Sequence, residues 1–498
     1  MADSRIHALT ERMWGMRPIP LLLWSAAGLM ILSLLGSREL WTLEGRWAAI
    51  CTEMLLRGDY LHPYLLGKPY YDKPLLSYWM MLLLSHVTGG LNEWSLRLPS
   101  ALAGLITIAC VWRLGSKLMN RHVGLLAGWI SVTTAFIIFW ARVSSTDMLN
   151  VAGVMLALVW YFEHRESTNF IHYAVFFMIL AVTSLTKGLI GAVIPVIVLL
   201  PDLLPKGQWK KHTNPSVFLA LIPALVVYFL PFLASNLIGS QDYGHSGLNK
   251  VFLENFVRFF QPFDHQGPIY TYLIYLPAYL MPWTFFFIPA AWYTVRHWRE
   301  LNPGASWAGW ATLLLFVFLT ASGSRRSYYV LPVVPFAILM TANWILEDGL
   351  QSLRVRWAGY TAVSSFILIF AWFGVLQPFI KSKANVEQYA KVLREQSSAV
   401  RPWSEMSILM VRAPEKIAYY LRPVRPPQRV NAAQLPSLLK EQPCHLIVSR
   451  INNRADLEPL LSGYKLVEEP LGLDYRLLRK KDKGKIIAFI PPRDLCGA

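Results

Sequence analysis

The chain has 498 residues, of which 54% are hydrophobic and only 15% are charged. An ordinary soluble protein has about 25% charged residues, so the composition excludes a typical soluble domain and predicts several membrane spans. The formal net charge is +17. Cytoplasmic loops of membrane proteins collect Lys and Arg, and the sequence has no zinc-finger, P-loop or Rossmann motif. The positive charge therefore does not indicate a nucleic-acid partner.

Long apolar segments follow one another as far as residue 380 and predict an all-α polytopic membrane protein. The first segment follows Arg5, Arg12 and Arg17 and lacks a small-residue cleavage site, so we interpret it as a span and not as a signal peptide. The eleven predicted spans are residues 18–36, 98–116, 123–140, 148–162, 170–186, 189–204, 216–238, 269–295, 307–321, 328–346 and 357–380.

The composition changes after residue 380. Strand-like runs such as MSILMV and CHLIVS alternate with helix-like runs such as APEKIAYYL, which predicts a small soluble α/β domain. We therefore divide the chain into a membrane domain, residues 1–380, and a C-terminal domain, residues 381–498. Cys444 and Cys496 lie in the second domain; they either form a disulfide, if this domain lies outside the cytoplasm, or remain two free thiols.

Residues 74–87 are apolar but too few to cross a bilayer, which takes about 20 residues. If they do not cross, the basic loop LPKGQWKKH lies in the cytoplasm, as the positive-inside rule favours. We therefore expect residues 74–87, and the amphipathic segment 44–57 before them, to lie along the external membrane surface. The same topology makes the C-terminal domain external, which in a bacterium is periplasmic.

With this topology, polar side chains gather on the external side, although each one alone also fits a role as a helix cap, a lipid anchor or a loop residue. Charges at membrane depth are costly and are usually paired or functional. Lys187 is the clearest case, because little more than Lys187-Gly188 joins two spans. The gathered residues are Glu44, Asp72, Lys73, Arg142, Asp147, Lys187, Glu254, Arg258, His265, Arg325, Arg326, Tyr328 and Tyr329.

Carboxylates beside cations at a lipid boundary suit the binding of a lipid-linked phosphate and the deprotonation of an incoming hydroxyl group. We predict Glu44 and Asp147 as candidate catalytic bases. The predicted donor-phosphate ligands are Lys73, Lys187, Arg258, Arg325 and Arg326. The predicted substrate-contacting or orienting residues are Asp72, Arg142, His265, Tyr328 and Tyr329. Asp72 and His265 are also candidate ligands of a divalent metal, and the need for such a cofactor stays open.

The stretch LEGRWAAICTEMLLRGDYLHPYLLGKPYYDKPLLSYW, residues 43–79, resembles the first external loop of the aminoarabinose transferase family, which modifies lipid A. That family belongs, with the protein O-mannosyltransferases, to the C-type glycosyltransferase membrane fold. The segments RLPSALAGL, LTKG, MPW and YYVLPVVP are also similar, and the resemblance covers residues 18–380. Two positions depart from the family pattern: Leu43 replaces the first acid of an acidic pair, and Asp72 replaces a Glu.

The resemblance implies about 11–13 transmembrane helices with external juxtamembrane helices. It implies an inverting transfer from an undecaprenyl-phosphate-linked sugar, such as 4-amino-4-deoxy-L-arabinose, to lipid A in the outer leaflet of the inner membrane. Since Glu44 stands at the family's acidic pair, it is preferred over Asp147 as the base. A protein or another polysaccharide remains an alternative acceptor. A transporter of lipid-linked sugars is disfavoured, because transporters place polar groups near the bilayer midplane, often between inverted repeats.

Overall fold

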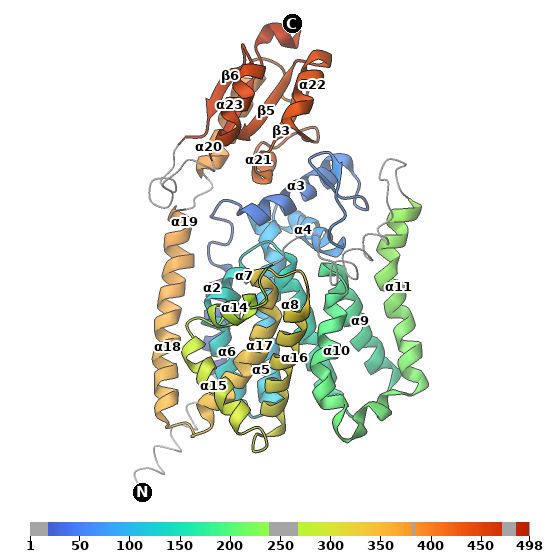
Figure 1. The fold of residues 1–498 in the computed structure, drawn as a ribbon, viewed down its shortest axis with the longest axis vertical. Helices are drawn as coiled ribbons and strands as arrows, with labels where there is room; N and C mark the ends of the chain where they lie inside the picture. The colour runs from blue at the N-terminus through green and yellow to red at the C-terminus, as the bar shows by residue number, and fades with distance from the viewer. Residues whose placement is uncertain (1–17, 239–266, 381–383, 471–484, 498) are drawn as a thin grey trace.

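The computed structural model describes residues 18–238, 267–380, 384–470 and 485–497. A bundle of helices forms one part of the molecule, and a small mixed domain stands on one end of it (Figure 1). The elements of the bundle are α2 (Pro18–Leu32), α3 (Thr42–Arg57), β1 (Tyr64–Leu65), β2 (Lys68–Pro69), α4 (Leu76–Val87), α5 (Glu93–Leu118), α6 (Arg121–Val132), α7 (Ala135–Ala141), α8 (Thr146–Glu163), α9 (Phe170–Lys187), α10 (Ile190–Leu203), η1 (Pro205–His212), α11 (Pro215–Leu237), α14 (Thr271–Tyr279), α15 (Thr284–Arg296), α16 (Pro303–Ala321), η4 (Ser327–Val333), α17 (Val334–Leu346), α18 (Leu353–Phe370), η5 (Ala371–Leu376) and α19 (Gln377–Ile380).

Six helices in the described residues are long and apolar enough to cross a membrane, or up to eight if each of two bent pairs is one span. The chain is thus a multi-pass membrane protein. All eleven predicted segments lie on helices, but the apolar helices of residues 18–36 and 189–204 are shorter than a full span, and two other segments are bent. Residues 269–295 bend by 119° between α14 and α15, and residues 123–140 bend by 66° between α6 and α7. Pro277 and Pro282 explain the first bend, because proline lacks the N–H that a continuous helix needs.

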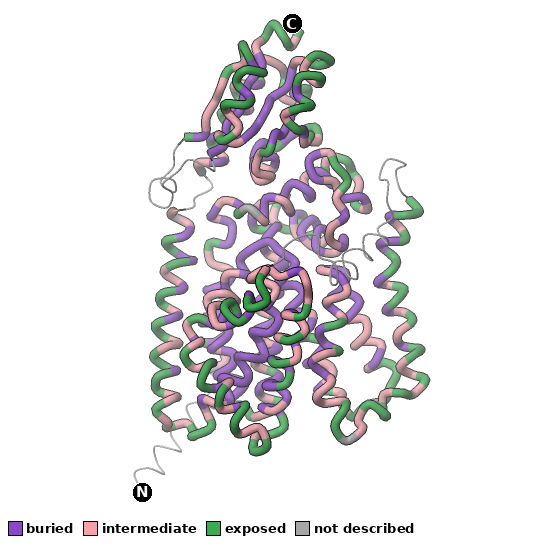
Figure 2. Tube along the Cα trace, viewed as in Figure 1, coloured by how far each residue is buried: buried purple, intermediate pink, exposed green. Residues whose placement is uncertain are grey.

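The helices differ in how much of their surface the protein itself covers. The apolar window of η4 and α17 is 83% buried inside the protein, whereas that of α18 and η5 is 22% buried. Figure 2 shows the contrast between a buried centre and the exposed outer face of α18. Exposed apolar side chains such as Val363, Ile367 and Leu368 lie on this outer helix. In a bilayer these side chains contact lipid, so α17 belongs to the centre of the bundle and α18 to its edge.

The two short helices α3 and α4 lie across the end of the bundle that faces the small domain (Figure 1). Helix α3 ends at Gly58, which has φ +65°, a conformation that favours glycine. Helix α4 has 12 residues and is followed by Gly89, with φ +75°. It is therefore too short to span, as its sequence predicts. The loop between α10 and α11, which contains the basic segment η1, lies at the opposite end of the bundle.

The C-terminal domain contains a five-stranded sheet in the order β4-β3-β5-β7-β6. Strands β3, β4 and β5 are parallel, and β7 runs antiparallel to both β5 and β6. Cys444 and Cys496 form a disulfide, which settles the choice between a pair and two free thiols. The main elements are α20 (Ala384–Ser398), β3 (Ser407–Val411), α21 (Glu415–Tyr420), β4 (Gln428–Val430), α22 (Leu435–Glu441), β5 (His445–Arg450), β6 (Lys465–Glu468), β7 (Ile486–Ile490) and η9 (Arg493–Cys496).

Helix α21 docks this domain directly onto α3. A Cβ atom on Gly45 would lie 2.6 Å from the backbone nitrogen of Lys416, so the two helices approach closely only because residue 45 has no side chain. The Lys416 ammonium pairs with Glu39 at 3.0 Å. The Tyr420 hydroxyl accepts a hydrogen bond of 2.9 Å from the Leu40 N–H. The C-terminal domain thus contacts the same part of the chain, residues 39–45, that leads into and begins the segment resembling the transferase family.

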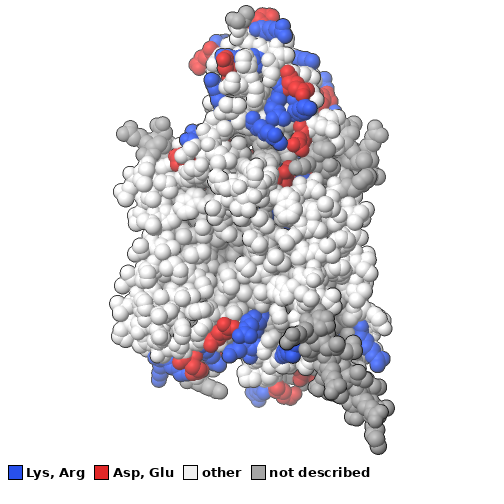
Figure 3. Space-filling model, turned by 180° about the vertical axis from the view of Figure 1, so that it is seen from behind, with Lys and Arg blue, Asp and Glu red and all other residues white. Residues whose placement is uncertain are grey.

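Charged side chains lie mainly at the two ends of the molecule. The view in Figure 3 shows a broad middle belt almost without Lys, Arg, Asp or Glu, between charged groups on the C-terminal domain and at the opposite end. An uncharged belt of this kind is what the hydrocarbon core of a bilayer requires.

Candidate active site

A polar cavity of about 300 Å³ lies where the external loop meets the ends of α8, α9 and η4. Seven of the site residues that we predicted from the sequence line its wall. The predicted lining residues are Asp72, Lys73, Asp147, Lys187, Arg326, Tyr328 and Tyr329. The others are Leu43, Arg46, Trp47, Pro69, Tyr70, Tyr71, Tyr78, Ser145 and Thr146.

Asp147 and Lys187 form a nearly buried ion pair in this cavity. Asp147 lies in the first turn of α8, which Ser145 caps, and Lys187 is the last residue of α9. The Lys187 Nζ lies 2.6 Å from Oδ1 of Asp147, and the two side chains are 14% and 8% exposed. The same ammonium lies 5.0 Å from the centre of the Tyr329 ring. A carboxylate and a cation are thus brought to one point of the wall from two different helices.

Asp72 and Lys73 belong to a second set of polar contacts in the wall of the cavity. The Lys73 Nζ lies 3.1 Å from Oδ2 of Asp72. The Tyr70 hydroxyl donates to that same oxygen at 3.1 Å and accepts from Arg46 Nη1 at 3.0 Å. Burial, and then the nearby Asp72 charge, raise the pKa of Tyr70 well above its ordinary value, so the phenol stays protonated. Asp72 therefore orients Lys73, as expected of an acid beside a lysine.

Arg325 and Arg326 are neighbours in the chain but point to different surroundings. The Arg326 guanidinium lines the cavity and donates a hydrogen bond to the Tyr328 hydroxyl. Arg325 does not line it; its Nη1 donates to the Gly267 carbonyl at 2.8 Å and its Nε to the Thr320 carbonyl at 3.0 Å. The prediction that Arg325 contacts the donor phosphate therefore needs correction, since its guanidinium joins the end of α16 to the segment before α14.

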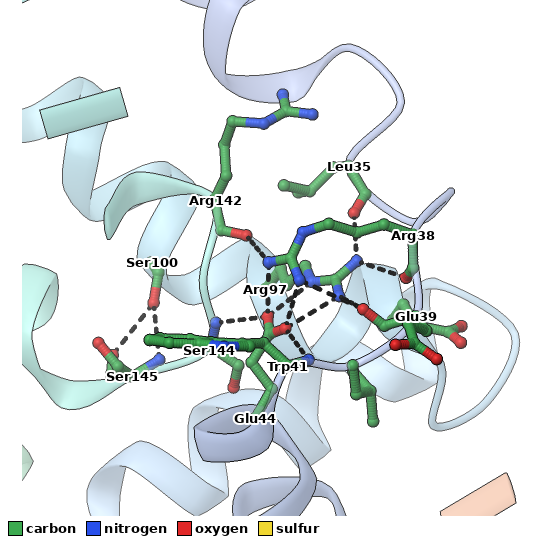
Figure 4. A network of polar contacts seen from close by, with 12 residues as sticks. Leu35, Arg38, Glu39, Trp41, Glu44, Arg97, Ser100, Arg142, Ser144 and Ser145 are labelled. Atoms are coloured by element: carbon green, nitrogen blue, oxygen red, sulfur yellow. Dashed lines mark hydrogen bonds and ion pairs between the residues drawn. The ribbon is translucent and has the colours of Figure 1, made fainter. Parts of the chain in front are cut away.

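Glu44 does not line the cavity. Figure 4 shows the network of hydrogen bonds and ion pairs around its carboxylate. Its side chain is fully buried, and each carboxylate oxygen accepts three hydrogen bonds. Arg38 and Arg97 provide four of these bonds, and the N–H groups of Trp41 and Ser144 provide the other two. Burial alone would raise the pKa of Glu44, but the two guanidinium charges outweigh it and lower the pKa to about 2.

This geometry contradicts the preference for Glu44 as the base. A base needs a lone pair that reaches the acceptor hydroxyl, and both Glu44 oxygens are already fully used. Its strongly lowered pKa also makes it a weak proton acceptor. The sequence could not reveal this, because Arg97 lies 53 residues away in the chain. Two carboxylates line the cavity, Asp72 and Asp147, and Asp72 is held by Lys73 and Tyr70, so Asp147 is the better candidate base.

The Arg142 side chain binds backbone carbonyl groups of another helix. Its Nη1 donates to the carbonyls of Met30 and Ile31, both at 2.9 Å, at the end of α2. The Arg142 carbonyl in turn accepts a hydrogen bond of 3.0 Å from Arg38. Its guanidinium turns away from the Glu44 network in Figure 4, and Arg142 does not line the cavity. The prediction that Arg142 orients substrate is therefore not supported by its position.

Three predicted residues, Glu254, Arg258 and His265, lie outside the described residues. Within the described ranges, no group of three or more His, Cys, Asp or Glu side chains could hold a metal ion. Asp72 is already engaged with Lys73 and Tyr70, so it is poorly placed as a metal ligand. The metal site at Asp72 and His265 stays a prediction, and no reaction step is derived from it.

Several residues of the site had no role in the sequence-based prediction. Arg46 and Tyr70 line the cavity, and Arg38 and Arg97 surround Glu44. The only sequence signal for Arg97 was a charge near the start of a long apolar segment, which is costly unless it is paired. Arg46 stood within the motif of the external loop, but its spacing from Tyr70 gave no indication of contact.

The sequence and the fold are similar to known membrane glycosyltransferases. Residues 72–234 match the dolichyl-phosphate-mannose-protein mannosyltransferase family. An undecaprenyl phosphate-α-4-amino-4-deoxy-L-arabinose arabinosyl transferase of Shewanella sediminis is 27% identical over 69% of this chain and 64% of its own length. The corresponding Pseudomonas paraeruginosa protein is 28% identical over 64% of this chain and 58% of its own length. The match thus spans less than two thirds of these relatives.

Solved structures show the same fold over nearly the whole chain. ArnT from Cupriavidus metallidurans, in its apo state, superimposes with a TM-score of 0.70 over 96% of this chain and 98% of its own, at 18% identity. An Archaeoglobus fulgidus oligosaccharyltransferase gives a TM-score of 0.55 over 88% of this chain and 69% of its own, at 14% identity. The resemblance inferred from the sequence is therefore confirmed: the chain is similar in sequence to aminoarabinose transferases and to the protein mannosyltransferase family, and it shares the membrane fold of ArnT.

Proposed function

We propose that this chain is an inverting membrane glycosyltransferase that moves a sugar from an undecaprenyl-phosphate carrier to lipid A. The observation that carries the proposal is the cavity in which Asp147 and Lys187 lie together with Lys73 and Arg326. Two carboxylates, Asp72 and Asp147, and four cations, Arg46, Lys73, Lys187 and Arg326, line this cavity at one end of the membrane bundle. The names of the sequence relatives support the donor and its sugar, 4-amino-4-deoxy-L-arabinose. A solved ArnT structure with a TM-score of 0.70 contains bound undecaprenyl phosphate, which supports the carrier.

In the proposed reaction, an acceptor oxygen attacks the anomeric carbon of the donor sugar and its proton passes to Asp147. The bond between that carbon and the phosphate oxygen breaks, and its electron pair stays on the phosphate. Lys187, Lys73 and Arg326 stabilise the charge that develops there. Without donor, Lys187 occupies Oδ1 of Asp147. A donor phosphate that draws Lys187 away frees this oxygen to accept the proton, so donor binding prepares the base.

The proposed location is the inner membrane of a bacterium, with the cavity and the C-terminal domain on the periplasmic side. The disulfide between Cys444 and Cys496 supports this side, because disulfides persist in oxidising compartments. The basic residues of η1, at the other end of the bundle, support a cytoplasmic position for that end.

Mass spectrometry of lipid A tests the proposal. Cells that express the chain should carry pentosamine-modified lipid A, and cells that express Asp147→Asn at the same protein level should not. Purified protein should transfer the sugar from the undecaprenyl-phosphate donor to lipid A in detergent. Unmodified lipid A in both assays, with folded protein and donor present, would overturn the acceptor assignment.

A further inference from the structure

A second cleft, of about 730 Å³, lies between the β1–β2 hairpin and the C-terminal domain. Gly67 and Lys68 of the hairpin form one wall. Arg425 and Pro426, which precede β4, and Gln428 and Arg429 of β4 form part of the other. The Arg429 N–H donates a hydrogen bond of 2.8 Å to the Leu66 carbonyl and joins the two walls. This hydrogen bond fixes the position of the hairpin relative to the C-terminal domain at the cleft.

The cleft is strongly basic. Five of its thirteen lining residues are Lys or Arg and only one, Glu405, is acidic. Three of the cations have a carboxylate partner: Arg57 with Glu53 at 3.5 Å, Arg401 with Glu405 at 3.1 Å, and Arg429 with Glu415 at 3.0 Å. The other two, Lys68 and Arg425, form no ion pair within the part of the chain that the structure describes.

This arrangement favours an anionic ligand. Gathering like charges in one cleft is unfavourable unless a counter-charge binds there. Guanidinium groups suit phosphate in particular, because their paired N–H donors match two phosphate oxygens. The Arg401–Glu405 pair is partly exposed, and exposed ion pairs contribute little, so an entering phosphate can replace this carboxylate at small cost. Glu53 is almost fully buried, so Arg57 stays paired with it.

The position of the cleft connects it to the active site. Lys68 lines the basic cleft, and the next residue, Pro69, lines the catalytic cavity. The hairpin is thus a wall shared by both spaces, and it leads directly to Tyr70, Asp72 and Lys73. The catalytic cavity has its own cations for the donor phosphate, so the cleft provides cations for a second anionic substrate.

We propose that the basic cleft binds phosphate groups on the head group of the acceptor, which is therefore a phosphorylated glycolipid. This inference rests on the proposed function and extends it, because it assigns a binding site to the acceptor. Lys68 and Arg425 are the principal ligands, and the hairpin sets how far the bound head group lies from Asp147.

Direct binding to the purified full-length protein in detergent tests this assignment without requiring turnover. The probes are a bisphosphorylated glucosamine disaccharide, the same disaccharide without phosphate, inorganic phosphate, and undecaprenyl phosphate. The Lys68→Gln/Arg425→Gln double variant should bind the bisphosphorylated disaccharide at least tenfold more weakly than the unchanged protein. Its affinity for undecaprenyl phosphate should be unchanged, and the unphosphorylated disaccharide should bind weakly to both proteins.

A Lys440→Gln/Lys465→Gln variant is the matched control, since it removes the same charge from exposed residues outside the cleft. Lys465 lies in β6, the sheet edge opposite β4. Equal losses in both double variants would mean a bulk charge effect and would overturn the assignment. Inorganic phosphate that binds as tightly as the disaccharide, or full competition by phosphatidylglycerol vesicles, would overturn it as well. Intact cleft binding without any sugar transfer would instead count against the proposed function.

Discussion

The carboxylate of Glu44 accepts a hydrogen bond of 3.0 Å from the backbone N–H of Ser144. Ser144 lies in the short connection between α7 and α8, three residues before Asp147. Arg97 of α5 binds the same carboxylate, at 2.7 Å. Glu44 thereby fixes the position of the N-terminal end of α8 relative to α3 and α5. We infer that it positions Asp147 through the backbone and is not itself a catalytic residue.

Glu44→Gln should destabilise the protein strongly. The amide cannot balance the charges of Arg38 and Arg97, which are both buried. Removing one partner of a buried ion pair costs about 3–5 kcal/mol. Thermal denaturation in detergent, followed by gel filtration, should show a clear loss of stability. Glu387→Gln is the control, because its ion pair with Arg422 is exposed and should contribute at most about 1 kcal/mol. Equal stability of the two variants would contradict a central role for the Glu44 network.

The same network predicts a pH dependence of stability. The folded protein lowers the pKa of Glu44 to about 2, against about 4.3 in an unfolded chain. The unfolded state thus binds the proton more readily, so the contribution of Glu44 is fully present above about pH 4.3 and is lost as the pH falls toward 2. The stability difference between the unchanged protein and Glu44→Gln should shrink over that interval. A difference independent of pH would show that the two arginines do not lower this pKa.

Asp147→Asn should abolish transfer while leaving donor binding largely intact. The amide keeps the size of the side chain but cannot accept the proton, and loss of a general base typically costs about 10²-fold or more. Single-turnover transfer and donor affinity should be measured on the same folded sample. The folded fraction of Glu44→Gln should retain more turnover than Asp147→Asn. The reverse order would return the role of base to Glu44.

Arg326→Gln and Arg325→Gln form a matched pair of neighbouring substitutions. Arg326 lines the cavity, so its loss should weaken binding of undecaprenyl phosphate by roughly tenfold or more, the scale of a hydrogen bond to a charged group. Arg325 binds two backbone carbonyls instead, so Arg325→Gln should leave donor affinity unchanged in the protein that folds. Equal losses of donor affinity would place Arg325 in the phosphate site after all.

Cysteine labelling tests the topology. Lys210 lies in η1 and Ser437 in α22, and both are exposed. With a thiol reagent that does not cross membranes, the proposed topology predicts that Ser437→Cys reacts from the periplasm. Lys210→Cys should react only after the inner membrane has been permeabilised. Background labelling should be low, because Cys51 and Cys110 are buried and Cys444 and Cys496 are paired. Reaction of both positions from the same side would contradict the arrangement.

Much of the architecture followed from local patterns in the sequence. Apolar runs are long and strongly marked, so all the predicted spans lie on helices, and the change of composition after residue 380 indicated the sheet domain correctly. Asp147, Lys187 and Lys73 could be grouped because a charge at membrane depth is unusual wherever it stands. The sharp bend between α14 and α15 was missed because proline also occurs inside membrane helices, as Pro289 does within α15.

The direction of a side chain was the part that the sequence could not provide. Arg325 and Arg326 have the same chemistry and adjacent positions, yet only the packed structure separates their surroundings. Glu44 stood in the motif that resembles the transferase family, a short distance before Asp72 and Lys73 in the chain. Its role depended on Arg97, which a different helix brings into contact, and such long-range pairing leaves no local pattern.

The contacts between α21 and the first external loop also determine when this protein can become active. The Leu40 N–H and the Tyr420 hydroxyl that bind each other are 380 residues apart in the chain. Lys416 and Glu39 are joined over a similar separation. During synthesis the external loop leaves the membrane long before its partners exist, since a chain folds from its N-terminus as it is made. In the topology that we propose, this loop gains its final support only after the C-terminal domain has been translocated and folded.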